Sequence, residues 1–496
     1  MKAFLERYGD RINPILVKEV RAALRGRWFK TSFAIVLCLA TIASMGYVMF
    51  AAPEGGAASG PGYFAIVLGC MGLALHGLVP FSAMLSMNAE SDEHTLELLQ
   101  ISGIPTARIV LGKLFAALIQ AGLVLSAFLP FLTFAFLLRG VGAGQIAITL
   151  VGSISACAAQ CSFGILLGSL ARARWARVLF MFVFGLFLLQ TSSGGVMFAV
   201  MFALAPGAAS ASTTGTAVTF LVFFAATVFF AVIAASRLAH PEENQSTPMR
   251  LSVTLVLVLG LVFVAFQGSL GAATVVAGVT LGFVAIPLMF MVTERERLPR
   301  AVATHLPRWS RIAPLQAWLP GGGRGVLYLV LNLSAFVAVY GILVFARFGG
   351  GLGGLGTVAG VQGNFAEIAS VVLIAFVFLG LPSALLTGFS DRLSGRSAVR
   401  VMVLLVLGLS AALPPLIGFF VDRRQVADWL LLAVPFRFNG DGSPESAGAV
   451  YMLGALAALT VLVNVKRVAN SFAEVRAARA RVSAYAVEVA RAATES

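Results

Sequence analysis

The chain has 496 residues, of which 59% are hydrophobic and only 11% charged, and its mean hydropathy is +0.94. Soluble domains carry about a quarter charged residues, so this composition excludes a soluble protein. The formal net charge of +14 would fit nucleic-acid binding in a soluble chain, but basic flanks of membrane spans produce the same excess. We therefore expect an all-α integral membrane protein without a nucleic-acid partner.

Residues 1–30 precede the first apolar block and are rich in basic side chains. Apolar residues recur there at every fourth position, as Leu16, Val20, Leu24 and Trp28. This spacing predicts an amphipathic cytoplasmic helix lying in the membrane interface, with its tryptophan at headgroup depth. The alternative is a basic flank that only orients the first span.

Apolar blocks of roughly 20 residues follow, the length at which a helix crosses ~30 Å of hydrocarbon. They predict about twelve transmembrane helices, at 31–51, 63–87, 112–138, 146–170, 177–196, 217–236, 250–267, 271–293, 326–346, 366–389, 400–420 and 447–465. The block at 177–196 has two interpretations because apolar residues continue to Ala205. It is either one tilted helix or a helix followed by a re-entrant or interfacial segment.

The distribution of basic residues predicts the orientation. With both termini inside, the outer segments hold only five of the 35 Lys and Arg residues, namely Arg139, Arg347, Arg423, Arg424 and Arg437. Inner loops of membrane proteins carry such an excess of Lys and Arg. We therefore expect both the N-terminus and the C-terminus on the cytoplasmic side.

The inner loop at 88–112 is the only strongly acidic one. Its first part combines carboxylates with a short apolar face and comprises Glu90, Asp92, Glu93, Thr95, Leu96, Glu97, Leu98 and Leu99. Anionic lipid would repel this segment. The residues alone leave two equal interpretations, a docking element for a soluble protein and a solvated loop.

Several segments together resemble the permease subunit of ABC-2 type transporters. They are the run from Glu90 to Leu99, Arg108-Ile-Val-Leu-Gly-Lys113, the opening Asn13-Pro-Ile-Leu-Val-Lys-Glu-Val-Arg21, and the stretches Ser236–Pro241 and Asn244–Arg250. The resemblance covers about residues 10–250. It implies a six-helix membrane unit over 31–250, a connecting helix at the N-terminus, and a coupling helix at about 90–100 that docks on an ABC ATP-binding subunit.

This chain lacks the phosphate-binding pattern Gly-x-x-x-x-Gly-Lys-Ser/Thr. We expect no enzymatic activity and no cofactor in the chain itself. The resemblance implies that ATP and Mg²⁺ are bound by the separate partner subunit.

The second half lacks a copy of the acidic segment. Residues 251–466 are expected to form a second six-helix unit, which a degenerate repeat would explain, and 467–496 a cytoplasmic helix. The longest inner linker, 293–324, is rich in Arg and contains Trp309 and Trp318, so we expect an interfacial helix and a turn.

Polar side chains inside the predicted spans are few. The candidates for a functional role are His76, Gln120, Gln160, Gln190, Asn332 and, at an outer edge, Glu367. A lone His among apolar residues is more often a hydrogen-bonded packing residue than a ligand. Cys157 and Cys161 could share a helix face, but no His or carboxylate joins them, so we predict packing residues and no metal site.

The resulting hypothesis is the permease subunit of an ATP-driven ABC-2 type exporter in the bacterial cytoplasmic membrane. Either one chain or a pair with a second permease copy would form the pathway. Two alternatives remain, an ion- or proton-coupled secondary carrier and a non-transporting membrane scaffold. The scarcity of intramembrane acids argues against the carrier, since ion coupling usually requires them.

Overall fold

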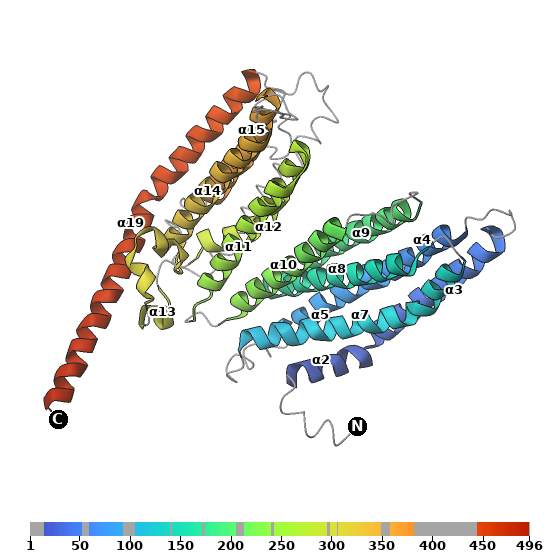
Figure 1. The fold of residues 1–496 in the computed structure, drawn as a ribbon. Helices are drawn as coiled ribbons and strands as arrows, with labels where there is room; N and C mark the ends of the chain where they lie inside the picture. Colours follow the sequence, from blue (N-terminus) through green and yellow to red (C-terminus); the bar gives the residue numbers. More distant parts are fainter. Residues whose placement is uncertain are drawn as a thin grey trace. The chain divides into compact units, whose positions relative to one another are not determined.

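The computed structural model describes residues 14–51, 59–92, 105–138, 141–170, 174–204, 213–239, 243–294, 298–304, 306–348, 358–380 and 444–495. Every element over these ranges is helical (Figure 1). The chain divides into two compact units, Met1–Ala239 and His240–Ser496, which are described separately below.

The first unit consists of helices of very different lengths. They are α2 (Pro14–Arg25), α3 (Arg27–Ala51), α4 (Ser59–Gly72), the π-helical turn η1 (Leu73–Leu78), α5 (Val79–Asp92), α7 (Thr106–Leu137), α8 (Ala143–Leu170), α9 (Arg174–Leu204) and α10 (Thr213–Leu238). Helix α2 starts at a proline, whose fixed φ suits the first helical position. Helix α9 is uninterrupted, so the block that sequence left open is a single helix.

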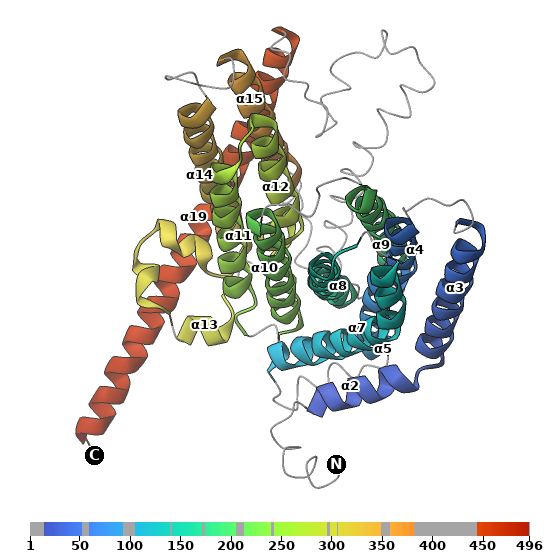
Figure 2. The same ribbon diagram turned by 45° about the vertical axis from the view of Figure 1, so that its right-hand side comes forward.

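Helix α8 lies between α5 and α10, and small residues let it approach α5 closely. A Cβ added at Gly168 would come within 2.8 Å of Met87 Cβ, and one at Gly164 within 3.0 Å of the Pro80 carbonyl oxygen. Helices in membranes commonly use glycine for such close approach. Helix α2 packs against α7, beneath it in Figure 2.

The second unit has long helices with a compact connection between two of them. They are α11 (Ser246–Phe266), α12 (Leu270–Val292), α13 (Arg300–Thr304), the 3₁₀ turns η3 (Arg308–Arg311) and η4 (Pro314–Trp318), α14 (Gly322–Phe348), α15 (Val358–Ala375), the π-helical turn η5 (Phe376–Gly380) and α19 (Pro444–Glu495). The predicted interfacial linker at 293–324 thus contains α13, η3 and η4.

Helix α19 is one element of 52 residues. It contains both the predicted span 447–465 and the predicted tail 467–496, and it runs beside α14 and α15 (Figures 1 and 2). Beyond its apolar part it packs on the linker, where Val475 joins Val302 and Leu319 in a buried apolar cluster. The tail is therefore a continuation of a membrane helix.

Nine helices in the described ranges are long and apolar enough to cross a membrane, which makes the chain a multi-pass membrane protein. They are Phe29–Met49, Gly60–Glu90, Thr106–Leu137, Ala143–Leu170, Phe220–Leu238, Ser246–Phe266, Leu270–Val292, Gly322–Phe348 and Leu453–Ala484. Shorter apolar helices, Arg177–Ser192 and Asn364–Gly380, fall at two further predicted spans. The predicted span 400–420 lies outside the described residues, so a total of twelve stays a prediction.

Large apolar side chains cover the outer faces of these helices. Ile42, Ile342 and Leu462, for example, are 67–68% exposed. Such faces are costly in water but suit hydrocarbon, because lipid tails are as apolar as the side chains themselves.

Candidate functional site

The first candidate site is a group of charged side chains in the first unit, most of them buried. We call it the Lys113 cluster, and it consists of Lys18, Glu19, Ser86, Glu90 and Lys113. Helices α2, α5 and α7 each contribute to it. The three helices are separated in sequence, and the packing of α2 and α5 on α7 brings their charged residues together.

Lys113 lies at the centre of this cluster, and its side chain is only 1% exposed. Its Nζ lies 3.0 Å from Glu19 Oε1 and 3.2 Å from Glu90 Oε2, and it also donates to the Ser86 carbonyl oxygen at 3.3 Å. Lys18 Nζ lies 3.3 Å from the other oxygen of Glu90. Two lysines therefore face two carboxylates, and the cluster is close to neutral.

Burial dominates the electrostatics of Glu19. The loss of solvent raises the pKa of its carboxyl above the usual value of 4.5. Lys113 acts in the opposite direction, while the nearby Glu90 raises the pKa further. A carboxylate in this position depends on Lys113 to stay ionised, because an unpaired buried charge is strongly unfavourable.

The apolar residues of the predicted N-terminal helix lie on two helices, α2 and α3. Leu16 and Val20 are half-buried on α2, whose buried face is formed instead by Ile15 and Glu19. Gly26 separates α2 from α3, so Trp28 belongs to the following helix and not to the one that holds Leu16, Val20 and Leu24.

The acidic segment is only partly described. Glu90 lies in the last turns of α5, and Asp92 ends that helix. The remaining predicted docking residues, Glu93, Thr95, Leu96, Glu97, Leu98 and Leu99, lie outside the described residues. Asn88, on α5, is 5% exposed, and its side-chain amide has no hydrogen-bond partner among the described residues.

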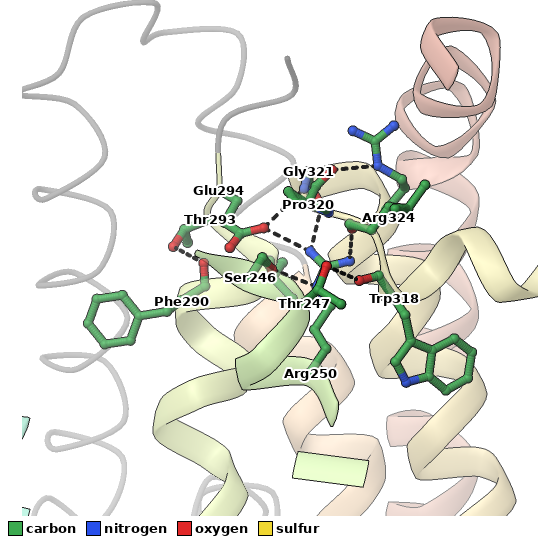
Figure 3. A network of polar contacts seen from close by, with 12 residues as sticks. Ser246, Thr247, Arg250, Phe290, Thr293, Glu294, Trp318, Pro320, Gly321 and Arg324 are labelled. Carbon is green, nitrogen blue, oxygen red and sulfur yellow. Dashed lines mark hydrogen bonds and ion pairs between the residues drawn. The ribbon is translucent and has the colours of Figure 1, made fainter. Parts of the chain in front are cut away.

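A second group of buried charges holds the linker of the second unit (Figure 3). Arg250 of α11 is fully buried, and its Nη2 donates to Glu294 Oε2 at 2.8 Å and to the Gly321 carbonyl oxygen at 3.0 Å. Its Nη1 donates to the carbonyl oxygens of Ala317 and Leu319. The planar guanidinium thus joins α11 to both ends of the linker, a role that a point-like ammonium could not fill.

Arg324, at the start of α14, joins that helix to α19. It is fully buried, donates from Nη1 to the Ser471 carbonyl oxygen at 2.8 Å, and lies 3.3 Å from Glu474 Oε2. Glu474 Oε1 also accepts a hydrogen bond of 2.7 Å from the Leu298 backbone N–H. These contacts fix the part of α19 around Ser471 and Glu474 on the linker.

The structure brings together two of the predicted intramembrane polar residues. His76, in the π-helical turn η1, lies 2.9 Å from Gln160 Oε1 through its Nδ1, and Gln160 Nε2 donates to Thr191 Oγ1 at 3.2 Å. With the Gln160 amide oriented in this way, its oxygen accepts from the His76 tautomer that carries the proton on Nδ1. This arrangement is a hydrogen-bonded chain across η1, α8 and α9.

The remaining predicted polar residues lie apart from that chain. Gln120 accepts from Ser82 Oγ at 2.9 Å, and Asn332 accepts from Thr254 Oγ1 at 3.3 Å. Gln190 is exposed on α9, and Glu367 is half-buried on α15. In the part of the chain that the structure describes, no group of three or more His, Cys, Asp or Glu is placed to hold a metal ion.

Sequence reasoning missed the charged pairs that organise both units. Lys113 and Arg250 entered the sequence analysis only as part of motifs and Arg324 only as a basic flank, so no charge partner was predicted for any of them. One signal was available, since Glu474 is an isolated acid in a basic segment. Comparison of the chain with protein-family models, with curated proteins and with solved structures gave no match.

Proposed function

We propose that the chain is the membrane-spanning permease subunit of an ATP-driven ABC-2 type transporter, with ATP and Mg²⁺ on a separate subunit. The observation that carries the proposal is the Lys113 cluster. It joins the N-terminal helix α2 to α5, which leads into the acidic segment, and to α7, which follows that segment. A force applied at 93–104 would therefore reach three helices at once.

The chemistry of the acidic segment supports a protein partner. Its carboxylates and leucines suit a groove on a soluble subunit better than an anionic membrane surface. ATP binding and hydrolysis would change the membrane part only if the ATP-binding subunit bound its two conformations with different free energies. The Lys113 cluster would couple the docked segment to α2 and α7 during that change.

The wider assembly follows from this proposal. The permease would lie in the bacterial cytoplasmic membrane with both termini inside, act in export, and form the pathway alone or with a second permease copy. The scarcity of acidic residues within the predicted spans fits a substrate moved by conformational work from the partner.

The test is affinity purification of the full chain from native membranes in mild detergent, with mass spectrometry of the co-eluting proteins. We expect a near-stoichiometric ABC ATP-binding subunit, lost in Glu97→Lys. The matched control is Glu243→Lys, which makes the same charge change at an exposed residue before α11. Recovery of the chain without an ATPase, or equal loss in both variants, would contradict the proposal.

A secondary carrier is the second candidate, and the His76–Gln160–Thr191 chain is the observation that favours it. A hydrogen-bonded histidine among apolar helices is a group that could take part in proton coupling. The purified chain alone would then transport in vesicles without ATP and stop when the proton gradient is collapsed, and His76→Gln would remove that dependence.

A further inference from the structure

The linker of the second unit exposes a short run of aromatic, aliphatic and basic side chains. Trp309 is 36% exposed and Ile312 is 55% exposed, and Arg308 and Arg311, in the same turn, are exposed as well. We call these four residues the η3 patch. No Asp or Glu occurs between Leu298 and Ala366, so the local sequence supplies no acid to balance its charge.

The turn that carries the η3 patch is held firmly from behind. Ser310, between its exposed neighbours, is fully buried and donates to the Pro307 carbonyl oxygen at 2.7 Å. Arg479 of α19 donates to Ser310 Oγ at 2.8 Å, and Gln316 donates to the Ser310 carbonyl oxygen at 2.9 Å. The exposed side chains are thus presented by an ordered backbone, which lowers the entropic cost of binding.

The position of the patch places it near the ends of membrane helices. The segment just after it, Ala317–Gly321, bonds to Arg250 in the second turn of α11 and to Glu294 directly after α12 (Figure 3). Helix α14 starts at Gly322. The linker therefore lies across the ends of three apolar helices. We infer that it lies at the level where lipid headgroups meet water, and the distribution of basic residues predicts that this end faces the cytoplasm.

From this geometry we propose that the η3 patch is a binding site for an anionic phospholipid headgroup of the cytoplasmic leaflet. Arg308 and Arg311 would contact the phosphodiester, because a guanidinium matches phosphate oxygens with two parallel hydrogen bonds. Trp309 would lie at headgroup depth, as interfacial tryptophans do, and Ile312 would enter the acyl boundary.

The lipid would have a structural consequence in the second unit. The same turn is bonded to α19 through Ser310 and Arg479, and α19 is bonded to α14 through Arg324 and Glu474. A headgroup on the η3 patch would hold the linker, and the part of α19 from Ser471 to Arg479, at the membrane surface. This inference concerns the chain alone and does not depend on a partner ATPase.

The test uses the full chain in nanodiscs of phosphatidylcholine and phosphatidylglycerol, with bromine, a collisional quencher of tryptophan fluorescence, on one lipid at a time. The difference in emission between the wild type and Trp309→Phe isolates Trp309. We expect stronger quenching of this component by brominated phosphatidylglycerol than by brominated phosphatidylcholine. In Arg308→Gln/Arg311→Gln the preference for phosphatidylglycerol should fall by roughly tenfold, since each basic residue contributes to anionic-lipid affinity.

The matched control is Arg476→Gln/Arg481→Gln, which removes the same charge from exposed positions of α19. This variant should keep the preference. Equal loss in both double variants would show that net charge alone attracts the lipid and would overturn the proposal. Quenching of Trp309 by aqueous acrylamide but by neither brominated lipid would also overturn it, because the turn would then face water or a soluble partner.

Discussion

Replacing Lys113 with methionine should strongly destabilise the first unit. The lysine side chain is 1% exposed and compensates two carboxylates, whose side chains are 11% and 7% exposed for Glu19 and Glu90. Removal of one partner from a buried ion pair typically costs about 3–5 kcal/mol, because a charge is left without compensation. Since Glu19 binds a proton more readily than usual, part of this cost is relieved, and we expect about 3 kcal/mol.

The free energy of unfolding can be measured by equilibrium denaturation in mixed micelles of mild detergent and dodecyl sulfate. The matched control is Lys18→Met, which removes an ammonium from the same cluster. Lys18 is 60% exposed and makes one ion pair at 3.3 Å, so its loss should cost no more than about 1 kcal/mol. A Lys113→Met effect as small as that of Lys18→Met would refute the assignment of Lys113 as the centre of the cluster.

A further variant separates the loss of compensation from the loss of packing. Adding Glu19→Gln and Glu90→Gln to Lys113→Met removes both uncompensated carboxylates. An uncompensated buried charge is the main cost of breaking a buried ion pair, and the two added substitutions remove it. Stability should therefore return most of the way to the wild-type value, and failure to recover would show that the lysine acts mainly through packing.

Three more predictions follow from single sites. Burial raises the pKa of the Glu19 carboxyl, so the stability that its protonated form contributes is complete below pH 4.5 and is lost as pH rises through the folded-state pKa. In Glu19→Gln the free energy of unfolding should depend less on pH in the window above pH 4.5, and an unchanged pH dependence would contradict the shift. Arg250→Lys should lower the free energy of unfolding by about 3 kcal/mol, because an ammonium cannot satisfy the carbonyl oxygens of Ala317, Leu319 and Gly321 together. The matched control, the exposed Arg481→Lys, should have little effect in the same denaturation assay. Gly325→Ala should lower the free energy of unfolding by about 1–3 kcal/mol, because the new Cβ would meet the backbone of α12. Gly282→Ala has open space around it and should be tolerated, and equal thermal midpoints for the two variants would refute the close approach.

Much of the helical architecture was predictable from local sequence. Apolar blocks long enough to cross hydrocarbon predicted nine of the spans, because each block must bury its backbone polar groups in a helix whatever its neighbours are. At α9 the apolar block is longer than one span needs, so the sequence admitted two interpretations, and the structure has one continuous helix. The sequence likewise predicted α19 as two segments, because its hydropathy changes at the membrane boundary although its helix does not end there.

Charge pairing was beyond the sequence. Its composition and spacing located the acidic segment and the basic flanks, but Lys113 pairs with Glu19 across 94 positions and Arg324 with Glu474 across 150. Periodicity assigns a residue to a face of its own helix, whereas a pair between helices depends on which helices pack together and at what height. Burial and the number of partners then set the expected importance of each charge. Lys18 and Lys113 are the same residue type in the same cluster, but Lys18 is 60% exposed with one carboxylate partner and Lys113 is 1% exposed with two.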